Sequence, residues 1–474
     1  MRHLIFALVA SMASVMADVK LAPPFQDRAV LQRDKPCPVW GSADPGEAIQ
    51  VTFKGQTKQT TADKDGKWRI QLDPLSVSAE PAEMVASGKN RIVLHDIVVG
   101  EVWFCSGQSN MAYLVSRAKN ATEEIASGNY PLIREFKVER DVAEAPVEDA
   151  KGKWQMATPQ TVGEFTAVGY YFARDIFQEL SVPVGLINAS WGGAYIESWL
   201  TPAGLEKDEA GRGAAKRWQG ILAKEQPSSE GAPKALSVKL KKEVAGGMFN
   251  HMVYPFRQYA LRGILWYQGE ANTPRARSYQ GLFHSLITRW RESFGQGDLP
   301  FYWVQLPNFK NSGPDNTERA VLREGQHSAL VLPATGQAVT IDIGEAADNH
   351  PKNKQDVGKR LALLALTNVY GLKKPYSGPQ ATRVERDGAR MRVFFSHAEG
   401  GLMAKSQPLT DFQIAGQDGK FQPATAVIDG ETLVVEASNV PEPVVVRYAW
   451  RNAPEASLFN QAGLPAAPFR TDKL

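Results

Sequence analysis

Cysteine and net charge are both scarce in this sequence of 474 residues. Its two cysteines, Cys37 and Cys105, allow at most one disulfide, and neither is flanked by the further ligands of a zinc site. Because Cys105 stands inside the apolar run VWFCSG, we expect two buried free thiols rather than a bridge. The 54 basic and 51 acidic side chains leave a net charge of +3, without blocks of like charge. This balance argues against nucleic acid or an anionic membrane surface as the main partner.

A hydrophobic run long enough to span a bilayer is also missing. The N-terminal stretch MRHLIFALVASMASVMA has a basic start, a short apolar segment and small residues at Val15 and Ala17. This pattern predicts a secretory signal peptide over residues 1–17, with cleavage after Ala17. We therefore expect an exported protein, periplasmic or extracellular, without a membrane span.

The remaining chain has the composition of a soluble globular protein, with 43% apolar and 22% charged residues. Its length predicts two to four domains. Residues 18–96 contain short strand-like runs between Pro-Gly and Asp-Gly turn signals, which predicts an N-terminal β-sandwich. Residues 372–474 also contain short strand-like runs, and we expect a second β-sandwich there.

Residues 97–371 differ because strand-like and helical segments alternate. The segment 165–180 is typical of the helices, since Val168, Phe172, Ile176 and Leu180 recur every four residues. We expect strands at residues 101–107, 183–190, 263–269, 300–307 and 338–344. This alternation predicts an α/β domain with a five-stranded parallel sheet and helices on both faces. The polar stretch 201–247 is predicted to be a partly helical surface insertion.

Polar or glycine-rich segments follow four of the five expected strands. They read SGQSNM, NASWGGAYIESW, WYQGEAN and DIGEAADNHPKNK. In an open parallel sheet, ligands bind where the carboxyl ends of the strands meet. A serine nucleophile needs a base and a group that orients the base. These segments supply Ser109, expected at a helix start, together with His350 and either Asp348 or Asp342 as the orienting carboxylate.

The same edge offers donors for a developing oxyanion. The candidates are the backbone N–H of Ser109, the N–H of Gly192 or Gly193, and the side-chain amide of Gln268. Each residue alone has a simpler structural explanation, such as a helix cap for Ser109. The convergence of independent segments favours catalysis. No cofactor is predicted and no metal, because Asp348 and His350 alone do not make a metal site.

The four motifs GQSNM, SWGGAYIESW, WYQGEAN and DNHPKNK, in this order, resemble the sialate O-acetylesterase family. That family is a branch of the SGNH-type hydrolases with a flavodoxin-like catalytic fold, and the resemblance covers most of residues 22–370. It implies that Ser109 attacks the acetyl carbonyl, His350 transfers the proton, and Gly193 and Gln268 are oxyanion donors. Asp348 is the first choice as orienting group. The wider SGNH pattern has its aspartate where this sequence has Ala347, so a Ser–His dyad stays open.

We therefore expect a serine esterase that removes O-acetyl groups from a carbohydrate, with sialic acid as the leading substrate, through an acetyl-serine intermediate. The expected substrate contacts come from Gln108, Asn110 and Glu270, with Arg323 as a clamp for a sugar carboxylate. The first alternative is an esterase for acetylated xylan or another polysaccharide.

Two further alternatives belong to other classes of protein. The predicted sandwiches and the eleven tryptophans suit a carbohydrate-binding protein. A glycosidase would use Glu197 and Glu270 as paired carboxylates, but it leaves Ser109 and His350 without a role. The oligomeric state and the role of the C-terminal region stay open.

Overall fold

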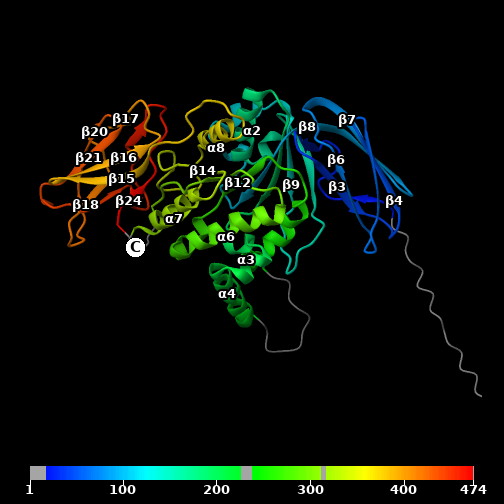
Figure 1. Cartoon of the computed structure of the whole chain (residues 1–474), viewed down its shortest axis with the longest axis horizontal. Coiled ribbons are helices and arrows are strands. Elements are labelled where there is room, and N and C mark those ends of the chain that lie inside the picture. Colours follow the sequence, from blue (N-terminus) through cyan, green and yellow to red (C-terminus); the bar gives the residue numbers. More distant parts are fainter. Residues whose placement is uncertain (1–17, 226–236, 311–315, 473–474) are drawn as a thin grey trace, which may run out of the picture.

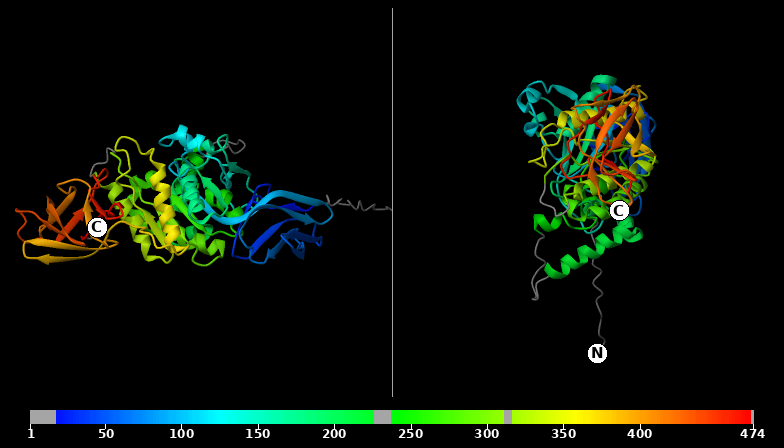
Figure 2. Two further views of the ribbon diagram at one scale, coloured as in Figure 1. Left: turned by 90° about the horizontal axis from the view of Figure 1, so that it is seen from above. Right: turned by 90° about the vertical axis from the view of Figure 1, so that its left-hand side faces the viewer.

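The computed structural model describes residues 18–225, 237–310 and 316–472, arranged as three regions in a row (Figure 1). A β region at the N-terminus and another at the C-terminus flank a central α/β region, as the view from above also shows (Figure 2). The expected signal peptide at residues 1–17 lies outside the described residues. None of the helices described is both long and apolar enough to cross a membrane.

The central region is built on a large, mostly parallel sheet with β8 (Arg91–Gly107) in its middle. Its strand order is β10-β9-β11-β8-β12-β13-β14, and only the pair β10–β9 is antiparallel among these described strands. The bounds are β9 (Tyr130–Val138), β10 (Gly152–Ala157), β11 (Val184–Ser190), β12 (Gly263–Tyr267), β13 (Phe301–Val304) and β14 (Thr335–Ala338). The mixed α/β class is as predicted.

The prediction of five strands was wrong in two places. It missed β9 and β10, because β9 carries Arg134 and Glu135 in its buried middle and does not read as an apolar run. It also placed the last strand at 338–344, whereas β14 ends at Ala338. Val339 and Ile341 pack into the hydrophobic core of the C-terminal region, so the chain leaves the sheet there.

Strand β8 joins the N-terminal region to the central sheet. Residues 91–100 pair with β7 (Ser78–Ser87) and β2 (Val30–Gln32), and residues 101–107 pair with β11 and β12. The expected domain boundary at residue 96 therefore falls inside one continuous strand. The other N-terminal strands are β1 (Lys20–Leu21), β3 (Cys37–Ser42), β4 (Ala48–Phe53), β5 (Gln56–Thr61) and β6 (Lys67–Leu72).

Helices cover both faces of the central sheet. On one face, α2 (Ala167–Leu180) and α8 (Lys354–Asn368) share a core with Trp103 of β8. On the other face, α6 (Ala276–Phe294) packs in a core with Phe104. Successive residues of β8 thus point into opposite cores, as a strand buried on both faces requires. The remaining helical segments here are α1 (Ala121–Ala126), α7 (Glu318–His327), η1 (Val115–Arg117), η2 (Val162–Glu164), η3 (Ile196–Trp199), η4 (Phe249–Val253), η5 (Tyr254–Phe256), η6 (Glu270–Arg275) and η7 (Ser328–Val331).

The polar stretch 201–247 contains α3 (Pro202–Lys207), α4 (Glu209–Glu225) and α5 (Val238–Lys241), with residues 226–236 outside the description. Helix α4 projects from the body of the molecule (Figure 1, Figure 2). Cys37 and Cys105 are free and buried, as predicted. Burial raises the pKa of Cys37 to about 12, so this thiol is unreactive at neutral pH.

The C-terminal region has its own hydrophobic core and three small sheets. Their strands, in sheet order, are β15 (Gln380–Asp387), β16 (Arg390–Ser396), β21 (Thr432–Glu436) and β20 (Thr425–Asp429); β19 (Gln422–Pro423), β18 (Phe412–Ala415), β22 (Val445–Tyr448) and β24 (Phe469–Arg470); and β17 (Leu402–Ala404) with β23 (Leu458–Asn460).

Candidate active site

Ser109 lies in a tight turn directly after β8. Gly107 ends the strand with φ +131°, and a Cβ there would lie 2.2 Å from the carbonyl oxygen of Tyr267, so glycine is required. The N–H groups of Met111 and Ala112 both donate to the carbonyl of Gln108, at 3.0 and 2.9 Å, and close the turn. The expectation that Ser109 begins a helix was wrong, because residues 108–112 form turns without helix.

His350 reaches Ser109 from the loop before α8. Its Nε2 lies 2.8 Å from Ser109 Oγ, although 241 positions separate the two residues in the chain. The imidazole stacks on Tyr113 with 6.3 Å between ring centroids and 18° between planes. Ser109 and His350 open onto a cavity of about 390 Å³, which is lined by Ser109, Ala112, Tyr113, Arg117, Arg140, Gly192, Asp348 and His350. A hydroxyl hydrogen-bonded to an accessible imidazole can act as a nucleophile.

The two candidate carboxylates have different surroundings. Asp348 Oδ1 accepts the backbone N–H of His350 at 2.8 Å and lies 3.6 Å from His350 Nδ1. The side chain of Asp342 is 5% exposed and forms two hydrogen bonds of 2.6 Å with the guanidinium of Arg360. Asp348 is therefore the carboxylate that lies beside the imidazole of His350, and Asp342 belongs to an ion pair with Arg360.

This difference predicts opposite consequences for the two Asp→Asn substitutions. We expect Asp348→Asn to lower kcat by roughly 10- to 100-fold without loss of stability, because the Asp348 side chain is 48% exposed and its contact with Nδ1 is loose. Asp342→Asn leaves Arg360 with a weaker partner and should lower the melting temperature, with kcat of the folded fraction changed less than about threefold. Acetate release measures the expected changes in kcat of both variants, and thermal unfolding measures the expected changes in melting temperature. A larger kcat loss in Asp342→Asn would contradict the assignment.

Backbone donors surround Ser109. Among the described residues, the N–H groups of Ser109, Gly192 and Gly193 have no hydrogen-bond partner. A Cβ on Gly192 would lie 3.4 Å from Ser109 Cβ, whereas one on Gly193 would face Lys242 Nζ at 3.3 Å. Gly192 is thus the glycine directly against Ser109, although Gly193 was expected.

The expected oxyanion role of Gln268 does not agree with the structure. Its side chain is fully buried, and its amide donates to the carbonyl of Ala194 at 3.2 Å and to Asn272 Oδ1 at 2.7 Å. Both hydrogens are used, so Gln268 has none to offer a substrate. Gln268 instead holds the loops after β11 and β12 together.

Three expected substrate contacts also lie beneath the cavity rather than in it. Gln108, Asn110 and Glu270 are each at most 8% exposed. Gln108 Oε1 accepts the N–H groups of Gly269 and Ala271, at 3.1 and 3.3 Å. Asn110 donates to Glu270 Oε1 at 2.5 Å. These side chains support the nucleophile turn from behind.

Arg323 is wrong as the clamp for a sugar carboxylate. It is 1% exposed and donates to the backbone carbonyls of Leu306, Pro307, Arg451 and Asn452. Its guanidinium fastens α7 to the C-terminal region.

Two other arginines, Arg117 and Arg140, line the cavity at Ser109, and neither was predicted from the sequence. Arg140 Nε donates to the carbonyl of Ser190 at 3.0 Å, and in the described structure its remaining guanidinium N–H groups have no partner. The exposed side chain of Arg117 likewise has no described partner. Arg140 follows β9, so a prediction of that strand would have placed it at the carboxyl edge of the sheet.

The positions of Glu197 and Glu270 do not favour a glycosidase. Glu197 is 4% exposed and binds Arg217, Arg275 and Asn272 at 2.8, 3.1 and 2.7 Å. Neither Glu197 nor Glu270 lines the cavity that contains Ser109. Within the described ranges, no group of three potential metal ligands occurs.

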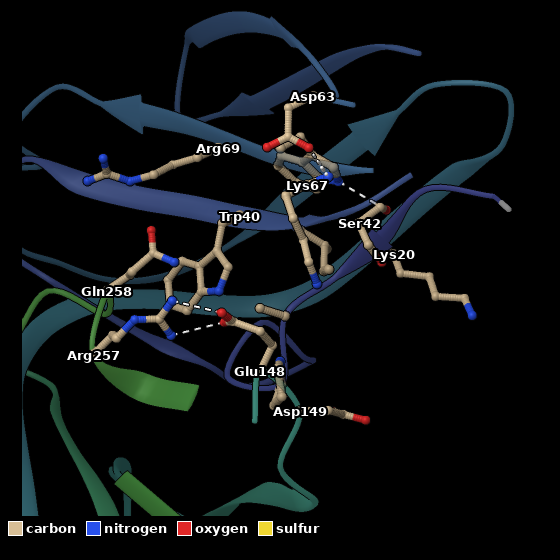
Figure 3. Close-up of a pocket in the computed structure, with 15 residues that line it drawn as sticks. Lys20, Trp40, Ser42, Asp63, Lys67, Arg69, Glu148, Asp149, Arg257 and Gln258 are labelled. Atoms are coloured by element: carbon tan, nitrogen blue, oxygen red, sulfur yellow. Dashed lines mark hydrogen bonds and ion pairs between the residues drawn. The ribbon is translucent and has the colours of Figure 1, made fainter. Parts of the chain in front are cut away.

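A second cavity of about 540 Å³ lies where the N-terminal strands β3 and β6 meet residues 148–149 and 257–258 (Figure 3). The ion pair between Glu148 and Arg257 lies at one side of it. No histidine is among its lining residues, so this cavity offers no pair of serine and histidine.

Comparison with known proteins shows the family to which this chain belongs. A family model described as carbohydrate esterase, sialic acid-specific acetylesterase, matches residues 99–367. Sialate O-acetylesterase of Mus musculus is 29% identical, over 98% of this chain and 96% of its own. The Homo sapiens enzyme is also 29% identical, over 91% and 88%.

The crystal structure of a carbohydrate acetylesterase from Xanthomonas citri has a TM-score of 0.87 and 37% identity, over 96% of this chain and 100% of that chain. The chain is thus a carboxylic ester hydrolase that acts in carbohydrate O-deacetylation. It belongs to the carbohydrate esterase family of sialic acid-specific acetylesterases, the family that its four motifs predicted.

Proposed function

We propose that the enzyme removes O-acetyl groups from sialic acid through an acetyl-serine intermediate on Ser109. The observation that carries this proposal is the 2.8 Å contact between Ser109 Oγ and His350 Nε2 in an accessible cavity. Ser109 Oγ attacks the acetyl carbonyl while His350 accepts the hydroxyl proton, and the unpaired N–H groups of Ser109 and Gly192 donate to the oxyanion.

The second half of the reaction uses the same groups. His350 passes its proton to the departing sugar oxygen, and the acetyl group stays on Ser109 Oγ. Water then enters, gives a proton to His350 Nε2 and attacks the acetyl carbon. Collapse of the second tetrahedral intermediate releases acetate, and the proton returns to Ser109. Asp348 keeps Nδ1 oriented through both halves.

Sialic acid is favoured over neutral sugars by the charge of the cavity. Arg117 and Arg140 both line it with guanidinium N–H groups free of described partners, and Asp348, the only carboxylate among the lining residues, is bound to His350. A carboxylate on the acetylated sugar would supply the partner that these arginines lack, since arginine pairs with carboxylates through charge-assisted hydrogen bonds.

A substrate panel with arginine variants tests this proposal. A hydrogen bond to a charged group contributes about 1.5–3 kcal/mol, so we expect Arg117→Ala and Arg140→Ala to lower kcat/KM on O-acetylated sialic acid by roughly 10- to 100-fold. Hydrolysis of a neutral aryl acetate should change less than about threefold. The matched control is Arg277→Ala on the exposed side of α6. Equal losses on both substrates, or faster wild-type hydrolysis of acetylated xylan than of acetylated sialic acid, would contradict the sialic acid assignment.

We also propose that the enzyme is exported, on the sequence of residues 1–17. N-terminal sequencing of the protein recovered outside the cytoplasm should then begin at Asp18.

A further inference from the structure

Asn110 connects the three segments that build the active site. It follows the nucleophile in sequence, and its side chain is fully buried. Its Nδ2 donates one hydrogen to Glu270 Oε1 at 2.5 Å, in the segment after β12, and one to the carbonyl of Asn349 at 2.8 Å. Because Asn349 directly precedes His350, the amide of Asn110 ties the serine turn to the histidine loop.

The third contact of this amide fixes its orientation. Lys354 Nζ donates to Asn110 Oδ1 at 2.5 Å from the first turn of α8. Lys354 is itself fully buried, and its Nζ lies 4.8 Å from the ring centroid of Tyr113 and 5.4 Å from that of Tyr267. An ammonium can only donate and a carboxylate can only accept, so Lys354 and Glu270 together allow a single orientation of the amide between them.

We propose that Lys354 and Asn110 are positioning residues, which set the His350 loop against Ser109 through the hydrogen bond from Asn110 to the carbonyl of Asn349. This inference rests on the proposed function, since it assigns the roles of nucleophile and base to Ser109 and His350. If Lys354 no longer holds Oδ1, the amide is free to turn and the Asn349 carbonyl loses its donor. The distance between Ser109 Oγ and His350 Nε2 then varies, and this lowers kcat rather than substrate affinity.

The charge of Lys354 depends on the burial of its ammonium group and on the carboxylates around it. Burial lowers the pKa of Lys354 to about 7, while the nearby carboxylates Glu270, Glu345 and Asp348 raise it. Glu270 Oε2 is buried without a partner, so its carboxylate helps to keep Lys354 charged. The groups around Lys354 are the three carboxylates and the rings of Tyr113 and Tyr267.

Lys354→Met tests the proposal with Lys359→Met as the matched control, because Lys359 is exposed on the same helix. We expect kcat for an aryl acetate to fall by roughly 10- to 100-fold in Lys354→Met, with KM changed less than threefold. Lys354→Arg, which keeps a cation and a donor, should recover part of kcat.

A double-mutant cycle separates positioning from general loss of structure. If Lys354 acts through Asn110, the variant with both Lys354→Met and Asn110→Ala should be no more than about threefold slower than the slower single variant. Losses that multiply, or a Lys354→Met enzyme with a kcat within twofold of that of the control, would overturn the proposal. If Lys354→Met does not fold, Asn110→Asp carries the test. It keeps an oxygen toward Lys354 and loses both hydrogens, so a kcat within twofold of wild type would also overturn it.

The same assays keep this inference distinct from the proposed function. If Ser109→Ala retains the wild-type rate, the proposed function fails. If Ser109→Ala is inactive but Lys354→Met behaves as its control does, only the positioning role fails.

Discussion

Ser109→Ala is expected to lower kcat for acetate release by about 10⁴-fold or more, the largest effect of any single substitution in this chain. The substitution removes the atom that forms the acetyl-enzyme, while the turn around it is held by backbone bonds from Met111 and Ala112 to Gln108 that do not involve the hydroxyl. The melting temperature should therefore stay close to that of the wild type. Acetate release from an aryl acetate, followed together with thermal unfolding, measures both expectations.

Ser116→Ala is the matched control, since Ser116 is exposed in η1, a few residues from the site. An organophosphorus probe should label the wild type at Ser109 and leave Ser109→Ala unlabelled. If Ser109→Ala kept its activity to within tenfold, another group would have to be the nucleophile. If the wild type bound acetylated glycans but released no acetate and took up no label, the chain would be a binding protein.

The part of the fold that the sequence predicted well is the part with uniform burial. Strands β11 and β12 are buried along their length, and helix α2 buries Val168, Phe172 and Ile176 at every fourth position. The prediction from the sequence missed strand β9 because the polar residues of this strand find their partners only in the folded protein. Arg134 donates to Asp96 at 2.8 Å, and Glu135 accepts from Asn188 at 3.0 Å and from the N–H of Thr166 at 2.9 Å. Burial raises the pKa of Glu135 to about 7, a property no local pattern reveals.

Some roles in the candidate site could likewise be predicted from the sequence, and others could not. The pairing of Ser109 with His350 was predictable, because both follow strands and chemistry requires the two together. The roles of Gln268 and Arg323 were not, because a sequence does not tell whether a polar side chain faces a cavity or backbone carbonyls. Arg323 binds carbonyls at 306–307 and 451–452, segments that only tertiary structure brings together. Arg140 was overlooked together with the strand that precedes it.

His350→Gln is expected to lower kcat by roughly 10³- to 10⁴-fold, somewhat less than the loss of Ser109. Glutamine keeps a side-chain amide near Ser109 Oγ but cannot accept the hydroxyl proton, so the serine stays a weak nucleophile. The residual activity comes from the backbone donors at Ser109 and Gly192, which the substitution leaves in place.

His95→Gln is the control for this prediction, since His95 is exposed on the N-terminal region and contacts Glu83 at 3.0 Å. Its kcat should match that of the wild type. A kcat of His350→Gln within tenfold of the wild-type value would assign the general base to another group. The carboxylate of Asp348 would be the first to examine, because it is the only carboxylate among the residues that line the cavity. A small loss of kcat in His350→Gln together with a larger loss in Asp348→Asn would then reverse the roles of base and orienting group proposed for the two residues.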